Sequence, residues 1–115
     1  MAEIKTATAM TRNARISPYK LRQVLELIRG KSAAKAVVIL KFSNKRAAGI
    51  ILKVLNSAMA NAEHNYGMDI DKLYVHEAFA DQGPMMKRFR PVSMGRAHPY
   101  VHKLSHVTIT LGERQ

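Results

Sequence analysis

Three histidines near the end of the chain have a spacing that suggests a metal site. His98, His102 and His106 follow one another at intervals of four residues, which would place them on one face of a helix. Pro99 interrupts the set, and the next residues are typical of a strand, where four residues span about 13 Å. Zinc ligands lie about 2.1 Å from the metal, and the chain has no cysteine to add a thiolate. The sequence therefore predicts no metal and no cofactor, with imidazoles that face solvent or phosphate.

Two pairs of residues could in principle act as general acids and bases: a carboxylate beside an imidazole, and two carboxylates two residues apart. Glu63 and His64 are neighbours, so on a helix their side chains point about 100° apart. Asp69 and Asp71 follow Gly67 closely, which is typical of a turn. The chain also lacks a phosphate-binding glycine loop, a nucleophile elbow and an HExxH motif. We therefore predict no catalytic residue and a protein that is not an enzyme.

Basic residues are the groups that the sequence has in excess. Lys and Arg number 19 against 8 Asp and Glu, so the formal net charge is +11. Residues 12–53 hold eleven basic and one acidic residue, residues 54–81 one basic and five acidic, and residues 82–112 five basic and no acidic. This segregation predicts one or two basic faces and a polyanionic partner.

Within the two basic regions, the residue types indicate phosphate contact. Few acids balance the first region, so we interpret its cations as phosphate ligands rather than as a solvated face: Arg12, Arg15, Lys20, Arg22, Arg29, Lys31 and Lys35. In the second region, Phe89 lies between Arg88 and Arg90, which suits phosphate contact combined with base stacking. The methionines there have two open interpretations, packing on bases or packing against the opposite arm of a ribbon: Met85, Met86 and Met94.

Helical spacing of apolar residues predicts three helices that carry the first basic region. The first covers about residues 18–29, with Ser17 as N-cap and Gly30 as its stop, and Ser32 caps a second, short helix with Ala36, Val37 and Leu40 on one face. The third begins after Ser43 or Asn44, runs to about Asn65 and ends at Gly67. Its apolar stripe contains Ala47, Ile51, Val54, Leu55, Ala58, Met59 and Ala62.

Period-two patterns predict strands on both sides of the second basic region. Residues 3–10, residues 73–80 with a possible bulge, and residues 107–111 read as strands. Between the last two, we interpret residues 82–106 as an extended two-armed β-ribbon with a reach of roughly 40 Å. Such a ribbon is marginal alone in water. We expect residues 84–104 to be mobile without RNA, and protease resistance of the isolated protein there would contradict this expectation.

Four segments together resemble one known family. They are NAEHN at 61–65, GPMMKRFRP at 83–91, MGRA at 94–97 and SHVTI at 105–109. In order and spacing they are similar to large-subunit ribosomal protein twenty-two of bacteria, over about residues 4–111. The resemblance implies an α+β fold, with three helices packed on a small three-stranded antiparallel sheet and a long protruding β-hairpin. It implies a single domain over residues 1–115, with the hairpin at about 82–106.

The resemblance also implies a function. Members of the family are structural constituents of the large ribosomal subunit that bind and organise its rRNA during assembly, and the hairpin tip lines the polypeptide exit tunnel. The implied partners are several domains of the large-subunit (23S) rRNA, neighbouring large-subunit ribosomal proteins and the nascent polypeptide, with no membrane. The implied location is the ribosome of the cytoplasm, or that of a plastid.

Combining the basic residues with the matching segments gives two sets of predicted site residues. The rRNA-binding set is Arg12, Arg15, Lys20, Arg22, Arg29, Lys31, Asn61, Asn65, Lys87, Arg88, Arg90, Arg96, His98, Lys103 and His106. By position in the family, the tunnel-lining tip is Met86, Lys87, Arg88, Phe89, Arg90, Met94, Gly95 and Arg96.

The sequence departs from the family at three ribbon positions. Val92 and Pro99 stand where the family usually has Arg, and His102 where it usually has Lys or Arg, so this ribbon is less cationic. Pro99 also lacks a backbone N–H, so one rung of the ribbon is predicted to be missing or to face an edge.

Two other classes of function fit the charge less well. A membrane-surface or acidic-protein binder needs a basic amphipathic helix with large aromatics, whereas residues 18–29 contain Glu26 and neither Trp nor Phe. A free regulatory RNA or DNA binder is the stronger alternative, but no clear helix-turn-helix is present and a methionine-rich ribbon is an unusual groove reader. No apolar run approaches the ~18 residues of a membrane span, and residues 1–6 do not resemble a signal peptide, so we expect a cytosolic or organellar protein.

Overall fold

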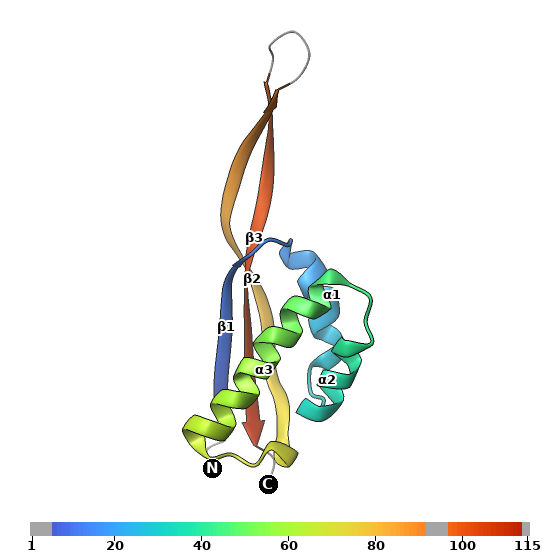
Figure 1. Cartoon of the computed structure of the whole chain (residues 1–115), viewed down its shortest axis with the longest axis vertical. Coiled ribbons are helices and arrows are strands. Elements are labelled where there is room, and N and C mark those ends of the chain that lie inside the picture. The colour runs from blue at the N-terminus through green and yellow to red at the C-terminus, as the bar shows by residue number, and fades with distance from the viewer. Residues whose placement is uncertain (1–5, 92–96, 114–115) are drawn as a thin grey trace.

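The protein is an α+β fold in which three helices lie on one face of a three-stranded antiparallel sheet (Figure 1). A computed structural model describes residues 6–91 and 97–113, without the side chains of Asn13 and residues 84–103. The elements in chain order are β1 (Thr6–Ala14), α1 (Pro18–Ile28), α2 (Ala33–Lys41), α3 (Arg46–Tyr66), the 3-10 turn η1 (Ile70–Lys72), β2 (Leu73–Pro91) and β3 (Ala97–Glu113). The predicted fold class is confirmed.

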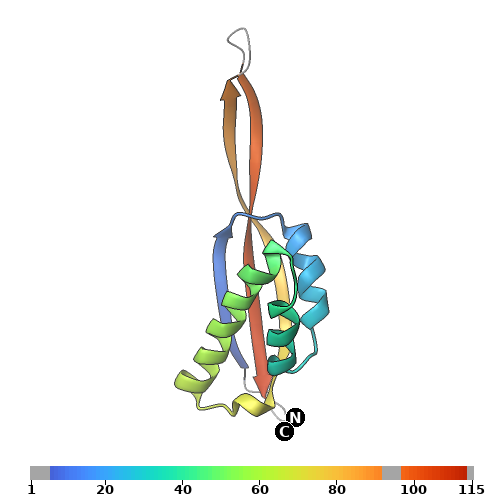
Figure 2. The same cartoon turned by 45° about the vertical axis from the view of Figure 1, so that its right-hand side comes forward.

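The sheet has the order β1-β3-β2, so the last strand of the sequence lies in its centre. Thr6 pairs with Gly112 and Thr11 with Val107 on one side of β3, and Leu73 pairs with Glu113 on the other. Figures 1 and 2 show all three helices on the same side of this sheet. Strand residues that face the helices are apolar and fully buried, which gives the sheet one covered and one open face: Leu73, Val75, Ala78, Ala80, Val107, Ile109 and Leu111.

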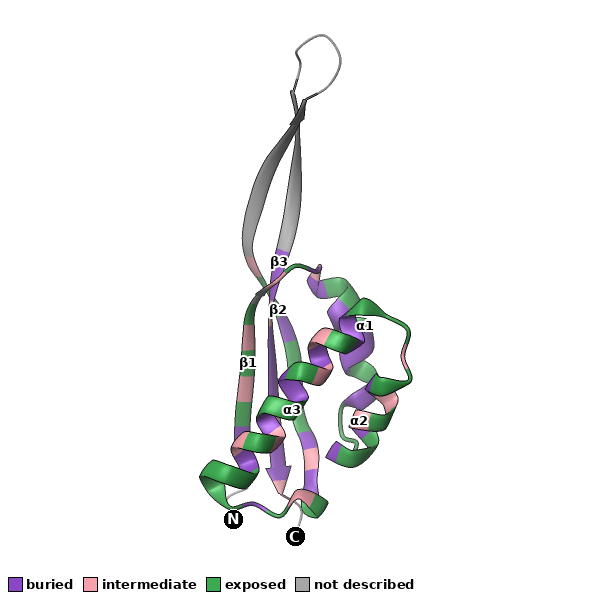
Figure 3. Cartoon of the chain, viewed as in Figure 1, coloured by how far each residue is buried: buried purple, intermediate pink, exposed green. Residues whose placement is uncertain are grey.

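The core lies between the helices and the covered face of the sheet (Figure 3). The helices contribute Leu21, Val24, Leu25 and Ile28 from α1, Ala33, Ala36 and Leu40 from α2, and Ala47, Ile51, Val54, Leu55, Ala58 and Ala62 from α3. The stripe predicted for the third helix is therefore confirmed, except that Met59 is half-buried and packs at the margin of the core.

The helix ends differ from the predictions by one or two residues. Ser17 precedes α1, but its side chain makes no capping hydrogen bond, whereas Ser32 Oγ accepts a bond from the backbone N–H of Lys35 at 3.3 Å. The cap predicted at Ser43 or Asn44 is wrong, because α3 begins after Lys45 and Ser43 Oγ instead accepts from the backbone N–H of Lys45. Gly67 ends α3 at φ +60°, a left-handed conformation that glycine adopts without strain.

The predicted strands are present but longer. The first covers Thr6–Ala14 rather than 3–10, with residues 3–5 outside the described part of the chain. The bulge predicted within the strand at 73–80 is confirmed by a register shift between Val75 and Glu77. The strands predicted at 73–80 and 107–111 continue into the ribbon, where the pairing of β2 with β3 resumes after a second register shift between Gln82 and Met85.

The ribbon leaves the sheet where β1 ends. The last pair of β1 with β3 is Ala14 with Ser105, whereas β2 and β3 stay paired from Met85 with Lys103 to Pro91 with Ala97. The molecule is accordingly elongated, with extents of 65 × 27 × 24 Å. Pro99 pairs in register with Phe89, and on its other side β3 has no neighbouring strand among the described residues. Proline is tolerated at such an edge, because no backbone donor is needed there.

Candidate nucleic-acid interface

Some of the predicted basic residues of the helical part lie toward the end of the domain from which the ribbon leaves, whereas Arg29 and Lys31 follow the other end of α1. β1 ends on the side of the ribbon, and α1 and α3 both begin there (Figures 1 and 2). These element ends carry exposed cations, of which Arg12, Arg15 and Lys20 belong to the predicted set. We name the exposed residues of these ends, together with those of the loop that runs from the end of α2, where Phe42 lies, up to the start of α3 (Figure 1), the hairpin-side surface: Arg12, Arg15, Tyr19, Lys20, Phe42, Lys45 and Arg46.

Neither helix that begins at this surface has an acidic residue in its first turn or a side-chain cap. The partial positive charge of a helix N-terminus is therefore left uncompensated by the chain itself at α1 and α3. Lys45 and Arg46 add full positive charges where α3 begins. The hairpin-side surface is thus cationic through both its side chains and its backbone dipoles.

Two arginines, one in α1 and one at its C-cap, stabilise the outer edge of β2. Arg22 donates from Nε and Nη2 to the carbonyl oxygen of Ala80 at 3.1 and 2.9 Å, and Arg29 donates from Nε to that of Ala78 at 2.8 Å. Edge carbonyls that would otherwise need water are satisfied in this way. The other guanidinium N–H groups make no bond to the described residues, so they remain for an anion while the guanidinium is held in place.

Lys31 contacts the outer edge of β2 through its backbone rather than its side chain. Its carbonyl oxygen accepts a hydrogen bond from the N–H of Val75 at 2.8 Å, and the N–H of Gly30 donates to the carbonyl of Val75 at 3.0 Å. The side chain of Lys31 is exposed. The α1–α2 connection therefore continues the protection of the β2 edge and leaves the lysine ammonium in solvent.

The two predicted asparagines are engaged within the fold. Asn61 Nδ2 donates to the carbonyl oxygen of Thr8 at 3.0 Å, which ties α3 to the edge of β1. Asn65 Nδ2 donates to Asn61 Oδ1, one helical turn away. Because Asn65 is exposed and Asn61 only half-buried, this pair stabilises the helix–sheet contact and still lies at the surface. Their role toward rRNA stays a prediction.

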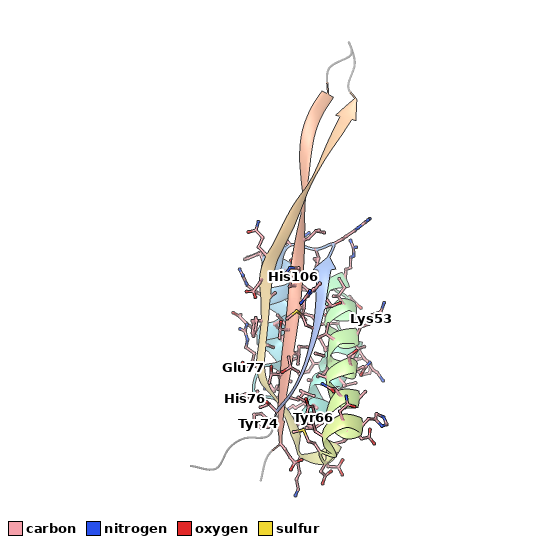
Figure 4. All side chains as sticks on the ribbon, turned by 90° about the vertical axis from the view of Figure 1, so that its left-hand side faces the viewer. Lys53, Tyr66, Tyr74, His76, Glu77 and His106 are labelled. Atoms are coloured by element: carbon pink, nitrogen blue, oxygen red, sulfur yellow. The ribbon has the colours of Figure 1, made fainter. Side chains whose placement is uncertain are left out.

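His106 lies where the ribbon leaves the sheet (Figure 4). It is half-buried and in register with Asp81 across the sheet. A Cβ atom placed on Gly83 would lie 3.1 Å from His106 Cε1 and 3.3 Å from the carbonyl oxygen of Leu104. Gly83 is thus required for close approach of the two strands beside the imidazole, and contact of His106 with rRNA stays a prediction.

The ribbon brings the remaining predicted residues into register through its backbone. Lys87 pairs with Val101, Arg88 with Tyr100, Phe89 with Pro99, Arg90 with His98 and Met86 with His102, and Lys103 pairs with Met85. Met94, Gly95 and Arg96 lie outside the described residues. Because His98 and His102 pair with β2 at separate rungs of the ribbon, the backbone does not bring the three spaced histidines to one point.

Sequence reasoning missed four residues of the hairpin-side surface. Tyr19 and Phe42 are 69% and 82% exposed, and Lys45 and Arg46 are exposed at the beginning of α3. The signal was available, because Tyr19 precedes Lys20 and Phe42 follows Lys41, the same interleaving of aromatic and basic residues as at Arg88–Arg90. Among the described residues, no group of three histidine or acidic side chains is arranged to hold a metal ion.

Comparison with protein families decides between the remaining classes of function. The family model of ribosomal protein L22p/L17e matches residues 9–112. The chain belongs to this family. An L22p/L17e protein is a structural constituent of the large ribosomal subunit, where it takes part in translation and binds large-subunit rRNA and ribosomal proteins. The family is structural rather than enzymatic.

The family assignment agrees with the cationic surface and the ribbon. It places the L22p/L17e chain in the ribosome, whose rRNA is the polyanion that the charge segregation predicts. No helix in the described part of the chain combines the length and the apolar character needed to cross a bilayer.

Proposed function

We propose that the chain acts as a single domain that organises large-subunit rRNA during assembly, with its hairpin tip lining the polypeptide exit tunnel. The observation that carries this proposal is the ribbon of β2 and β3, which extends past the end of β1 with no third strand beside it among the described residues. From Gln82 to Pro91, at about 3.3 Å per residue, its first arm spans roughly 30 Å. That length suits a segment that passes between RNA helices rather than one that rests on their surface.

The positive charge of the ribbon and of the surface at its foot also supports insertion of the ribbon into rRNA. Residues 82–112 hold five basic residues and no acidic one, and the hairpin-side surface at the foot of the ribbon is cationic as well. Both parts therefore attract phosphate on the same end of the molecule. The tip residues proposed to line the tunnel, and to meet the nascent polypeptide there, are Met86, Lys87, Arg88, Phe89, Arg90, Met94, Gly95 and Arg96.

The opposite end of the domain holds four of the seven acidic residues in the described part of the chain. The end of α3, the turn η1 and the end of β3 lie near the chain termini in Figure 1, and the sequence of these segments contains Glu63, Asp69, Asp71 and Glu113. Lys72 in η1 and Lys31 beside the start of β2 lie at the same end, so this end is mixed in charge and suits neighbouring ribosomal proteins better than it suits phosphate. We therefore propose one orientation, with the ribbon directed into the rRNA and the acidic end directed away from it, in a ribosome of the cytoplasm or of a plastid.

Sedimentation of the tagged full chain from cell lysate through a sucrose gradient with magnesium tests this proposal. The chain is expected to migrate with the large subunit, to resist moderate salt and to leave those fractions after rRNA digestion. Crosslinks from the ribbon are expected to reach rRNA and, in translating ribosomes, the nascent chain. Recovery only in light fractions, with other RNA or none, would contradict it and favour a free RNA binder.

A further inference from the structure

Two aromatic side chains of the hairpin-side surface are far more exposed than folding requires. Phe42 is 82% and Tyr19 is 69% exposed, while the core is complete without either ring. Among the described residues, the one aromatic ring contact joins Tyr74 and His76, so neither ring is held by another. A single exposed ring is common in proteins, so exposure alone decides nothing.

The charges around the two rings supply the second observation. Tyr19 is followed by Lys20 and preceded by Arg15, and Phe42 lies between Lys41 and Lys45. Residues 4–25 and 27–62 contain no acidic residue. Along the chain both rings are therefore flanked by positive charge, which favours a polyanion with flat apolar faces of its own.

A folded duplex offers phosphates but hides the faces of its bases. Unpaired nucleotides offer both, and in proteins that bind them aromatic rings stack on bases while cations contact the backbone. A membrane surface fits less well, because Val38 alone lies a helical turn from Phe42 and Leu27 lies two turns from Tyr19, which does not make the continuous apolar face of an interfacial helix.

We propose that Tyr19 and Phe42 are base-stacking residues, which make the hairpin-side surface selective for unpaired nucleotides over duplex RNA. This inference rests on the proposed function, because it names the form of RNA that the same surface takes. Lysines and arginines around the rings supply affinity that does not depend on base pairing, and the two rings supply the preference.

Binding of the full chain to two RNA probes of equal length tests the proposal. The probes are an oligoadenylate strand and a duplex, each about 20 nucleotides long, which exceeds the ~4–16 nucleotides that one small domain covers. The variants are Tyr19→Leu and Phe42→Leu, singly and together, which remove the aromatic face but keep an apolar side chain. Because both sites are exposed, unfolding by urea should be unchanged, and this is measured first.

Tyr66→Leu is the matched control. Tyr66 is 59% exposed but lies on α3 one turn from Glu63, near the acidic end (Figure 4). We expect the double variant to lose about fivefold or more in affinity for the single strand, since stacking on one aromatic ring contributes from about 5- to about 150-fold. Affinity for the duplex, and both affinities of Tyr66→Leu, should change less than about twofold.

The outcomes separate the two proposals. If the unaltered chain binds neither probe, or binds them without salt dependence, the proposed function is overturned. If it binds both with salt dependence, but the double variant weakens the two probes equally or behaves like Tyr66→Leu, the rRNA-binding function stands and the stacking role is overturned.

Discussion

Strands β2 and β3 pass through two environments, and the two halves of the pair are stabilised by different interactions. Between residues 105 and 112, β3 has β1 on one side, β2 on the other and three helices over one face, and Val107, Ile109 and Leu111 are fully buried. Between residues 97 and 103, β2 is its one neighbouring strand in the described part of the chain. The same backbone pairing therefore continues from a region with a core into a region without one.

The junction between these halves is itself well bonded. Ser105 is fully buried, and its Oγ donates to the carbonyl oxygen of Ile16 at 2.6 Å. Ile16 in turn donates its backbone N–H to the carbonyl of Ala14, where β1 ends. The foot of the ribbon is thus anchored to the β1–α1 loop. The domain thus fixes where the ribbon starts, and we expect a partner to stabilise the rest of it, because a two-stranded ribbon is marginal alone in water.

Removing a core side chain from the sheet half should have the largest effect. Ile109 is fully buried, so Ile109→Ala is expected to lower the free energy of unfolding by about 2–5 kcal/mol. Val101→Ala, at a ribbon position where β3 has one neighbouring strand, should cost less than about 0.5 kcal/mol. Urea denaturation of both variants checks the contrast. Equal losses would mean that the ribbon shares the cooperative core of the domain.

Removing charge from the ribbon should have the opposite pattern, with a small effect on stability and a large effect on RNA binding. Replacing Lys87, Arg88, Arg90 and Lys103 together by Gln is expected to change the free energy of unfolding by less than about 1 kcal/mol, since surface charges contribute little to stability. The slope of log K against log salt for large-subunit rRNA should fall by about 3, at ~0.7–0.9 for each phosphate that the variant no longer neutralises.

Lys72→Gln is the control for this charge removal. Lys72 is the one basic residue among residues 54–81, at the end of η1 near the acidic end of the domain. Its replacement should leave the salt slope unchanged within about 0.3. A similar change of slope per charge in both variants would show that binding follows net charge rather than the ribbon.

The covered half of the fold could be predicted from the sequence because its signals are local. Apolar spacing indicated the helices and the stripe of α3, and strict alternation indicated the strand at residues 107–111. The beginning of α3 was misplaced, because Ser43 and Asn44 are favourable caps whereas Lys45, which the structure uses, is not. The continuity of β2 and β3 depends on cross-strand pairing, which no single window of sequence reveals.

The positive charge of the interface could be predicted from the sequence, but the hydrogen bonds that its residues make within the fold could not. Sequence reasoning assigned Arg22, Arg29 and Asn61 to rRNA, and each proves to bond a strand carbonyl within the fold. These partners lie 58, 49 and 53 residues away, so only the tertiary structure pairs them. Tyr19 and Phe42 were missed because helical spacing gave no reason to separate an exposed ring from a buried one.

A small effect on stability is expected at Arg29, whose side chain is predicted to contribute both to folding and to rRNA binding. Arg29→Met keeps the aliphatic packing of the side chain but removes the donor to Ala78, so the free energy of unfolding should fall by about 1 kcal/mol. The same change should weaken rRNA binding, because the remaining N–H groups are removed with the charge.

Lys31→Met, where the backbone rather than the side chain protects the β2 edge, should weaken binding without altering stability. Urea denaturation and the salt slope for rRNA, measured on both variants, check the difference. If Arg29→Met is as stable as the unaltered chain, the guanidinium serves the RNA alone and the β2 edge does not depend on it.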